Sequence, residues 1–168
     1  MRELELILSG GRVKRYHAKP TLHEETVGHH SFIVAWLVEL LSVGLPRAQL
    51  LLAALQHDLP ECITGDLPAP SKKKFGISEQ FSAYEVEILE DYGHQHMAGQ
   101  LTTEELKLLS LADKLAGIIH CIHERRLGNR YLDRTYGNYV SYVDKEAMPT
   151  PRALKLYHHL KGQWNDCK

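Results

Sequence analysis

The sequence is poor in cysteine, has no long apolar run and has no excess of charge of either sign. Its three cysteines, Cys62, Cys121 and Cys167, are scattered without a C-x-x-C pair, so neither a disulfide framework nor a cysteine zinc ribbon is indicated. No stretch approaches the roughly 20 apolar residues that span a bilayer. We therefore expect a cytoplasmic protein with no signal peptide and no membrane association.

The charges balance, with 20 basic and 21 acidic residues giving a formal net charge of -1. This composition argues against a protein that binds a nucleic-acid polymer, because such a protein needs a basic face. An anionic ligand must instead meet a local basic cluster. Histidine is abundant, at 11 residues, and it is a frequent metal ligand as well as a group that titrates near neutral pH.

Apolar periodicity predicts helices along the whole chain and no strands. Apolar residues recur at helical spacing from Val27 to Leu41, which is typical of a helix with one buried face. The segment 63–76 holds two prolines, two glycines and three consecutive lysines and is predicted to be an ordered loop. The length fits one domain. The prediction is an all-α, single-domain helical bundle over 1–168, with helices at about 27–42, 47–58, 78–92, 103–127, 131–145 and 151–163.

Two polar residues occupy positions where apolar residues are expected. His30 shares a helical face with Val27. Asp113 lies on the apolar face of the predicted helix 103–127, and a buried carboxylate is costly unless it is paired or bound to a metal. Taken alone, His30 fits a hydrogen-bonded core histidine, and Asp113 fits a buried salt bridge to Arg15 or to a lysine.

The adjacent pair His57 and Asp58 forms a third polar feature, at the end of a predicted helix before Pro60. Neighbouring helical residues point about 100° apart, so both reach one ion only if it lies at the helix end. Together with His30 and Asp113, the pair offers two imidazoles and two carboxylates. This mixed donor set suits zinc, manganese, cobalt or iron better than calcium.

These four residues form the pattern H…HD…D, and longer motifs accompany it. With these motifs the chain resembles the HD-domain phosphohydrolases, and within them the bacterial 5′-deoxynucleotidases. The resemblance covers most of the first 115 residues and implies an HD-type helical bundle that hydrolyses a deoxynucleotide with the help of a metal. The motifs are R-Y-H at 15–17, E-T-V-G-H-H-S-F at 25–32, H-D-L-P-E at 57–61, T-G-D-L-P-A-P at 64–70 and L-A-D-K-L at 111–115.

The resemblance also implies roles for individual residues. Glu61 matches the acidic residue that positions or activates the attacking water, and Asp66 matches the aspartate that assists it. The alternatives are that Glu61 only pairs with an arginine and that Asp66 only shapes a turn. His29 could replace His30 as a metal ligand. His30 is preferred because the family histidine is the one immediately before the serine, here Ser31. The four metal ligands that the resemblance implies are His30, His57, Asp58 and Asp113.

The resemblance also implies which residues contact the substrate. Arg15 matches an arginine that contacts the substrate phosphate. Tyr16 stands where the 5′-deoxynucleotidases place a tryptophan against the sugar, and this departure bears on base and sugar selection. The remaining predicted substrate-binding residues are Pro70, Lys72, Lys73 and Lys74. The alternative is that the three lysines are only a solvated run of charge.

The chain is shorter than typical bacterial 5′-deoxynucleotidases, and its opening S-G-G-R-V-K-R-Y-H at 9–17 looks more like the compact phage HD enzymes that hydrolyse deoxynucleoside triphosphates. The resemblance therefore favours a triphosphohydrolase, with dATP as the favoured substrate and deoxynucleoside as a product. A 5′-deoxynucleotidase acting on dNMPs is the alternative. A non-catalytic nucleotide-binding regulator is disfavoured because every ligand position and Glu61 are intact, and a signalling-nucleotide hydrolase because of the motif at 64–70.

The resemblance further implies cofactors and partners. The cofactor is a divalent transition metal, namely zinc, cobalt or manganese. A second ion such as magnesium, bridged by Asp58, Glu61 and Asp66, would suit a triphosphate. The expected partner is the deoxynucleotide substrate, and the chain is expected to form a homo-oligomer.

Overall fold

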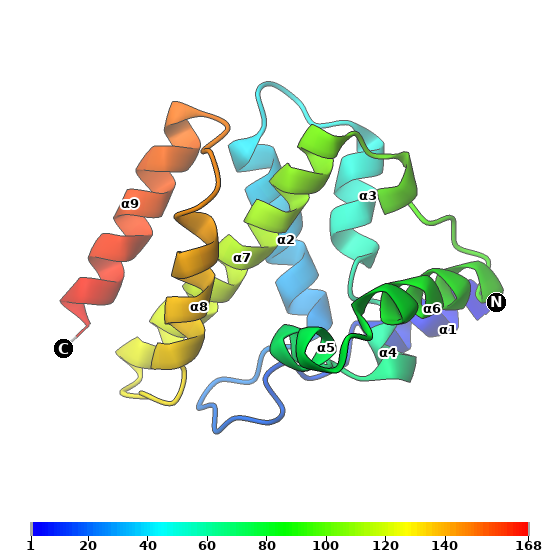
Figure 1. The fold of residues 1–168 in the computed structure, drawn as a ribbon, viewed down its shortest axis with the longest axis horizontal. Helices are drawn as coiled ribbons and strands as arrows, with labels where there is room; N and C mark the ends of the chain where they lie inside the picture. The colour runs from blue at the N-terminus through cyan, green and yellow to red at the C-terminus, as the bar shows by residue number, and fades with distance from the viewer. Residues whose placement is uncertain (1, 168) are drawn as a thin grey trace.

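The longest helix, α7 (Thr103–Arg126), runs through the middle of the molecule, and α2, α3, α8 and α9 pack against it (Figure 1). In this computed structural model residues 2–167 are described, apart from the side chains of Ala69 and Pro70. Within that range there is no strand, only an isolated antiparallel bridge between Lys14 and Thr26. The elements other than α7 are α1 (Arg2–Gly10), α2 (Val27–Leu41), α3 (Ala48–Gln56), α4 (Glu61–Thr64), α5 (Ala69–Phe75), α6 (Ser78–Asp91), the 3-10 turn η1 (Ala98–Gln100), α8 (Asp133–Val143) and α9 (Pro151–Asp166).

The main core lies between α7 and α2 and continues towards α8 and α9. Val34 and Val38 of α2 and Leu115 and Ile118 of α7 are fully buried in it, and each such side chain contributes about 1.5–3 kcal/mol of hydrophobic free energy. The predicted all-helical bundle is confirmed. Among the described helices, none is both long enough and apolar enough to cross a membrane.

Both helices that carry the predicted ligands in the core begin at side-chain caps. Thr26 accepts a hydrogen bond from the backbone of His29 at the start of α2. Thr102 and Glu105 form a reciprocal capping box at the start of α7, which satisfies two backbone donors that the helix leaves open. The caps fix where each helix begins, and so they fix the depth at which His30 and Asp113 enter the core.

Three helices, α1, α4 and α5, differ from the sequence prediction. The segment 63–76 was expected to be a loop, but it contains α5. Proline is tolerated in the first turn of a helix, where its missing N–H costs nothing, and Gly76 ends α5 in the left-handed conformation with φ 67°, as a C-terminal cap does. The helices α1 and α4 were not predicted.

Glycines allow α1 to meet α2 and the end of α3 closely. A Cβ atom at Gly10 would lie 2.7 Å from the carbonyl oxygen of Leu59, and one at Gly28 would lie 2.9 Å from that of Gly11. The backbone N–H of Gly28 donates to this Gly11 oxygen at 3.1 Å. The three elements therefore converge beside the residues that follow α3.

Gly117 permits a similar approach on the other side of α7. A Cβ atom there would lie 2.5 Å from the ring of Tyr139 on α8. We predict that Gly117→Ala destabilises the fold by about 1–3 kcal/mol through overpacking. Gly137→Ala is the matched control, since Gly137 is also helical but has no atom within 4 Å of its Cβ position, and alanine there should stabilise by about 0.5–1 kcal/mol. Denaturant unfolding of both variants checks the prediction, and equal effects would contradict it.

Candidate metal centre

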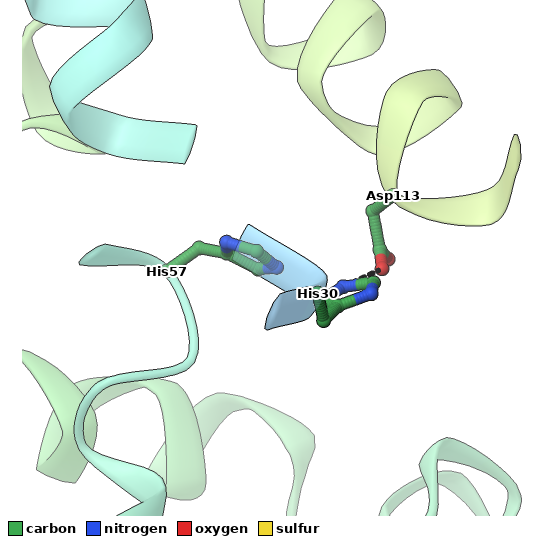
Figure 2. Close-up of side chains that lie close together, drawn as sticks. All are labelled: His30, His57 and Asp113. Carbon is green, nitrogen blue, oxygen red and sulfur yellow. Dashed lines mark hydrogen bonds and ion pairs between the residues drawn. The ribbon is translucent and has the colours of Figure 1, made fainter. Parts of the chain in front are cut away.

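The four predicted ligands come from three elements that meet beside the core. His30 lies in the first part of α2 and is fully buried, while Asp113 lies midway along α7. His57 caps the C-terminal end of α3, and Asp58 follows it in the turn before α4. Figure 2 shows the side chains of His30, His57 and Asp113 converging from these separate elements.

The donor atoms of His30, His57 and Asp113 all lie within 4.8 Å of one another. Nε2 of His30 is 3.0 Å from Oδ1 of Asp113. Asp58 borders this group, with its Oδ2 3.3 Å from Nε2 of His57 and 3.7 Å from Nε2 of His30. Ligands held at about 2.0–2.2 Å from one ion have adjacent donor atoms roughly 3 to 3.6 Å apart. The spacing therefore fits a divalent transition metal.

The hydrogen bonding of His57 also fits a ligand. Its Nδ1 is 2.8 Å from the carbonyl oxygen of Ala54, and a carbonyl can only accept, so Nδ1 carries the proton. In the neutral ring Nε2 is then the unprotonated nitrogen, and it is buried without a hydrogen-bond partner among the described residues. A histidine that is held at one nitrogen and presents the other to a cluster of donors is the usual arrangement at a metal. Nδ1 of His30, unlike Nδ1 of His57, is buried without a hydrogen-bond partner among the described residues.

Asp58 is bound to Arg15 as well as bordering the group. Nη1 of Arg15 donates to Oδ2 of Asp58, and Nε of Arg15 donates to Oε2 of Glu25 at 3.2 Å. The Arg15 side chain is only 10% exposed. The predicted phosphate-binding arginine thus lies beside the ligand group but is engaged by two carboxylates, which hold it in place.

The electrostatics of the group favour a bound cation. Burial disfavours the charged form of His57, but the attraction of Asp58 and Asp113 outweighs it and raises the pKa of His57 to about 9. Lys114 forms an ion pair with Asp113, so the salt bridge considered from the sequence exists, with Lys114 rather than Arg15 as its partner. The carboxylates attract whatever positive charge is close, and a divalent ion would displace the proton of His57.

Glu61 and Asp66, the predicted catalytic carboxylates, follow Asp58 along the chain, and the charges of Asp58 and Asp66 both act on Glu61. Glu61 begins α4, and its buried Oε2 has no hydrogen-bond partner among the described residues. Burial, reinforced by the charges of Asp58 and Asp66, raises the pKa of Glu61 to about 9. A nearby cation would favour its ionised form. Oδ2 of Asp66 accepts a hydrogen bond from the backbone N–H of Tyr16 at 3.1 Å, so Asp66 also fixes the segment that carries Arg15.

Tyr16 is held tightly and in an uncommon conformation. It is the non-glycine residue with positive φ among those described, at 55°, a conformation that costs free energy and persists only where contacts enforce it. Its ring stacks on that of His120 with centroids 4.6 Å apart, and its hydroxyl lies 3.0 Å from that of Tyr139. Burial lowers the pKa of His120 to about 4, so its ring is neutral at pH 7.

Several residues around the site were not assigned a role from the sequence. Glu124 is fully buried and accepts hydrogen bonds from the backbone N–H groups of Leu22 and His23, which attaches the segment before α2 to α7. His120 lies two turns after Asp113 on the same face of α7, and Glu124 one turn further, so a polar stripe on an apolar helix was the available signal. Glu25 and Tyr139 gave no such signal.

The remaining predicted residues lie outside the ligand group. His29 is exposed and is not part of the group, so the structure favours His30 over it. Lys72 donates to Oε1 of Glu85 at 3.2 Å and lies over the ring of Phe81, with its Nζ 3.8 Å from the ring centroid. Lys73 and Lys74 are exposed in the last turn of α5. The side chain of Pro70 lies outside the described residues.

Solved structures with this fold define the class of protein. The HD phosphohydrolase DatZ of cyanophage S-2L, bound to dA and one catalytic Zn²⁺ ion, superposes with a TM-score of 0.73 at 18% identity, covering 96% of this chain and 95% of that one. An HD-domain phosphohydrolase from Listeria innocua superposes with a TM-score of 0.66 at 18% identity, covering 95% of this chain and 97% of that one. The chain has the helical fold of the HD-domain phosphohydrolases.

The sequence comparison gives the family. The model of the YfbR-like 5′-deoxynucleotidases matches residues 7–154. A 5′-deoxynucleotidase of Photorhabdus laumondii is 27% identical over 138 residues, which cover 70% of each chain. The chain belongs to the YfbR-like 5′-deoxynucleotidase family and is a hydrolase of the HD-domain type. The resemblance predicted from the motifs is thereby confirmed.

We predict that His57→Ala and Asp113→Ala each lower the amount of bound metal and abolish hydrolysis, because each removes a donor from a group with few others. Elemental analysis of the purified protein gives the metal content per chain. His158→Ala is the matched control, since His158 is exposed on α9. Metal content that is unchanged in both ligand variants would refute the site.

Glu61→Gln should separate metal binding from the chemical step. The substitution keeps the shape of the side chain but removes a group that can accept a proton, and a general base contributes roughly 10²- to 10⁴-fold to the rate. We expect normal metal content and a kcat lower by that factor. Full activity of this variant would show that Glu61 has only a structural role.

Proposed function

We propose that this protein is a metal-dependent 5′-deoxynucleotidase, which hydrolyses a deoxynucleoside 5′-monophosphate to the deoxynucleoside and phosphate. One observation carries the proposal: the buried His30 and the partly buried His57 and Asp113 bring donor atoms within 4.8 Å of one another. Glu61, which follows His57 by four residues, has a buried carboxylate oxygen without a hydrogen-bond partner among the described residues. The family model over 7–154 supports the choice of substrate class, and its curated members are named for this reaction.

We assign the metal to His30, His57 and Asp113, with Asp58 as the fourth ligand. A bound divalent ion would supply Lewis acidity and lower the pKa of a water molecule towards neutrality. The mixed imidazole and carboxylate set suits zinc, cobalt or manganese, and the zinc of the DatZ structure supports zinc first. Asp58, Glu61 and Asp66, whose charges act on one another, are the candidates for a second ion such as magnesium.

The protein residues then have separate tasks. The attacking water loses a proton to Glu61, its oxygen forms a bond to phosphorus, and the bond from phosphorus to the 5′ oxygen breaks. The leaving 5′ oxygen takes up a proton and becomes the hydroxyl of the deoxynucleoside. Arg15, fixed by Asp58 and Glu25, places a guanidinium charge where negative charge accumulates on the phosphate. Tyr16, held by His120 and Tyr139, supplies a rigid aromatic surface next to it.

A deoxynucleoside triphosphate triphosphohydrolase, with dATP as the favoured substrate, is the second candidate. The observation that favours it is the position of α5: Lys72 pairs with Glu85, and Glu85 lines the same hollow of about 160 Å³ as His57. Lys72 is thus linked through Glu85 to the hollow that His57 lines, and a longer phosphate chain that extends towards α5 would meet it. The DatZ structure holds dA, which supports a deoxyadenosine group in the substrate for either candidate.

The deciding experiment incubates metal-loaded protein with each dNMP and each dNTP and separates the products by chromatography. Release of deoxynucleoside and phosphate from dNMPs, with dNTPs left intact, supports the proposed function. Deoxynucleoside released from dATP but not from dAMP would establish the second candidate instead. Hydrolysis of neither set by a protein with full metal content would refute both.

The lysines of α5 give a second, independent prediction. Because Lys73 and Lys74 are exposed and Lys72 is held by Glu85, a monophosphatase should lose less than about threefold in kcat/KM when Lys73 and Lys74 are changed to alanine. A triphosphohydrolase should lose roughly ten- to a hundredfold on dATP for each charged contact that is removed. Arg15→Ala is the comparison, since it should impair both substrates alike.

A further inference from the structure

A second group of imidazole rings lies outside the candidate metal centre, around the last turns of α7. His120 and His123 are three residues apart on this helix, so their side chains leave it on the same side. The segment between α1 and α2 passes beside these turns (Figure 1), and Glu124 of α7 accepts hydrogen bonds from the backbone of Leu22 and His23 in this segment. His23 is thereby held next to the two histidines of α7. We call His23, His120 and His123 the histidine cluster.

The spacing of the rings in the histidine cluster fits imidazoles that share one ion. The ring centroid of His23 lies 4.8 Å from that of His123 and 6.3 Å from that of His120. A nitrogen ligand lies about 2.0–2.1 Å from zinc, so two imidazoles on one ion have centroids roughly 4.5–6.4 Å apart for bond angles from about 90° to 180°. The rings assigned to the candidate metal centre, those of His30 and His57, are 5.4 Å apart and fall in the same range.

His120 has a ring nitrogen that the protein leaves without a partner. Its side chain is only 2% exposed, and its Nε2 is buried with no hydrogen-bond partner among the described residues. Its Nδ1 lies 3.5 Å from Oε1 of Glu25. A carboxylate beside one nitrogen and no partner at the other is the arrangement that orients a histidine towards a metal. A buried polar atom without a partner is costly, and an ion bound at Nε2 would remove that cost.

The charge state of His120 also suits a ligand. Burial lowers the pKa of His120 to about 4, and the neighbouring His23 and His123 act in the same direction. The ring is therefore neutral at pH 7, as a metal ligand must be. The charge of Glu124 acts on His120 in the opposite direction, so this carboxylate would favour a bound cation. The stacking of Tyr16 on His120 is no obstacle, because a metal binds a ring nitrogen in the plane of the ring and leaves both faces free.

The other rings can adjust to an ion, and a fourth imidazole is within reach. The side chains of His23 and His123 are exposed, so their rings can turn a nitrogen towards the buried Nε2 of His120. His29, exposed in the first turn of α2, has its ring centroid 6.3 Å from that of His23 and is the candidate for the fourth coordination position. A set of imidazoles alone suits zinc, copper or nickel, whereas magnesium and calcium require oxygen ligands.

We propose that the histidine cluster is a second transition-metal site, which binds one zinc-like ion and links the segment that carries Arg15 and Tyr16 to α7. The segment is already attached to α7 through its backbone at Glu124, and the ion adds a link through the side chain of His23. Because the site is assembled from separate elements, it exists only in the folded chain, so binding of the ion stabilises the fold. The site shares no donor with the candidate metal centre and does not depend on the proposed function.

The test measures zinc binding to the untagged chain after His57→Ala has disabled the candidate metal centre. Competition with a chromophoric zinc chelator gives the number of ions and the Kd. We expect about one zinc ion per chain, and a thermal midpoint about 5 to 10 °C higher at roughly 100 times the Kd. Adding His23→Ala or His123→Ala should weaken binding at least about a hundredfold, since loss of an outer partner of a ligand alone costs about 10- to 100-fold. Adding His158→Ala is the matched control, because His158 is exposed on α9.

Zinc binding that is lost with His23→Ala and with His123→Ala but kept with His158→Ala supports the proposal. Absence of zinc binding by folded His57→Ala at about 100 µM zinc overturns it, and so does binding that survives the loss of both cluster histidines. An equal loss with His158→Ala also overturns it, because binding is then non-specific. If circular dichroism shows that His57→Ala does not fold, the same substitutions are compared in the wild type, where each cluster variant should lose one of about two ions. Zinc lost only with His57→Ala belongs to the candidate metal centre, so the two sites can fail separately.

Discussion

The contact between His30 and Asp113 is the constraint on which the site depends, because it joins two polar side chains across the packed faces of α2 and α7. His30 is fully buried, and its Nε2 lies 3.0 Å from Oδ1 of Asp113. A buried polar group without a partner costs several kcal/mol, so His30 could not be kept in this core without the carboxylate or a cation. The hydrophobic packing of the two helices brings the donors together, and the donors in turn require a cation or a proton between them.

The carboxylates near that contact outnumber the positive charges that neutralise them. Asp58 pairs with Arg15 and Asp113 pairs with Lys114, while the charges of Asp58 and Asp66 act on Glu61. Asp58 and Asp113 raise the pKa of His57 against the effect of burial, whereas burial raises the pKa of Glu61 and the charges of Asp58 and Asp66 reinforce it. Binding of a divalent ion would release those protons, which leaves Glu61 ionised and able to accept a proton from water. Metal binding and general-base chemistry are thus coupled by charge.

The sequence was informative where a residue contradicts its local pattern. His30 and Asp113 could be found because each interrupts an apolar helical stripe, and the motifs around them gave the family. The loop predicted at 63–76 was wrong because proline and glycine were taken to end helices, whereas the structure uses them to begin and end α5. Contacts between distant segments gave no sequence signal. Glu25 beside Arg15 and Tyr139 beside Tyr16 are examples, since their partners are set by tertiary packing alone.

The conformation of Tyr16 links the core to the substrate side of the site. Its left-handed backbone is stabilised by three contacts made by distant residues: the carboxylate of Asp66 on its N–H, the ring of His120 against its own ring, and the hydroxyl of Tyr139. Tyr139 reaches that position only because Gly117 has no side chain. A single missing Cβ on α7, one turn after Asp113, therefore determines how the aromatic residue beside Arg15 is held. The helix that carries the proposed metal ligand Asp113 therefore also sets the position of Tyr16, so a change in α7 packing would alter both together.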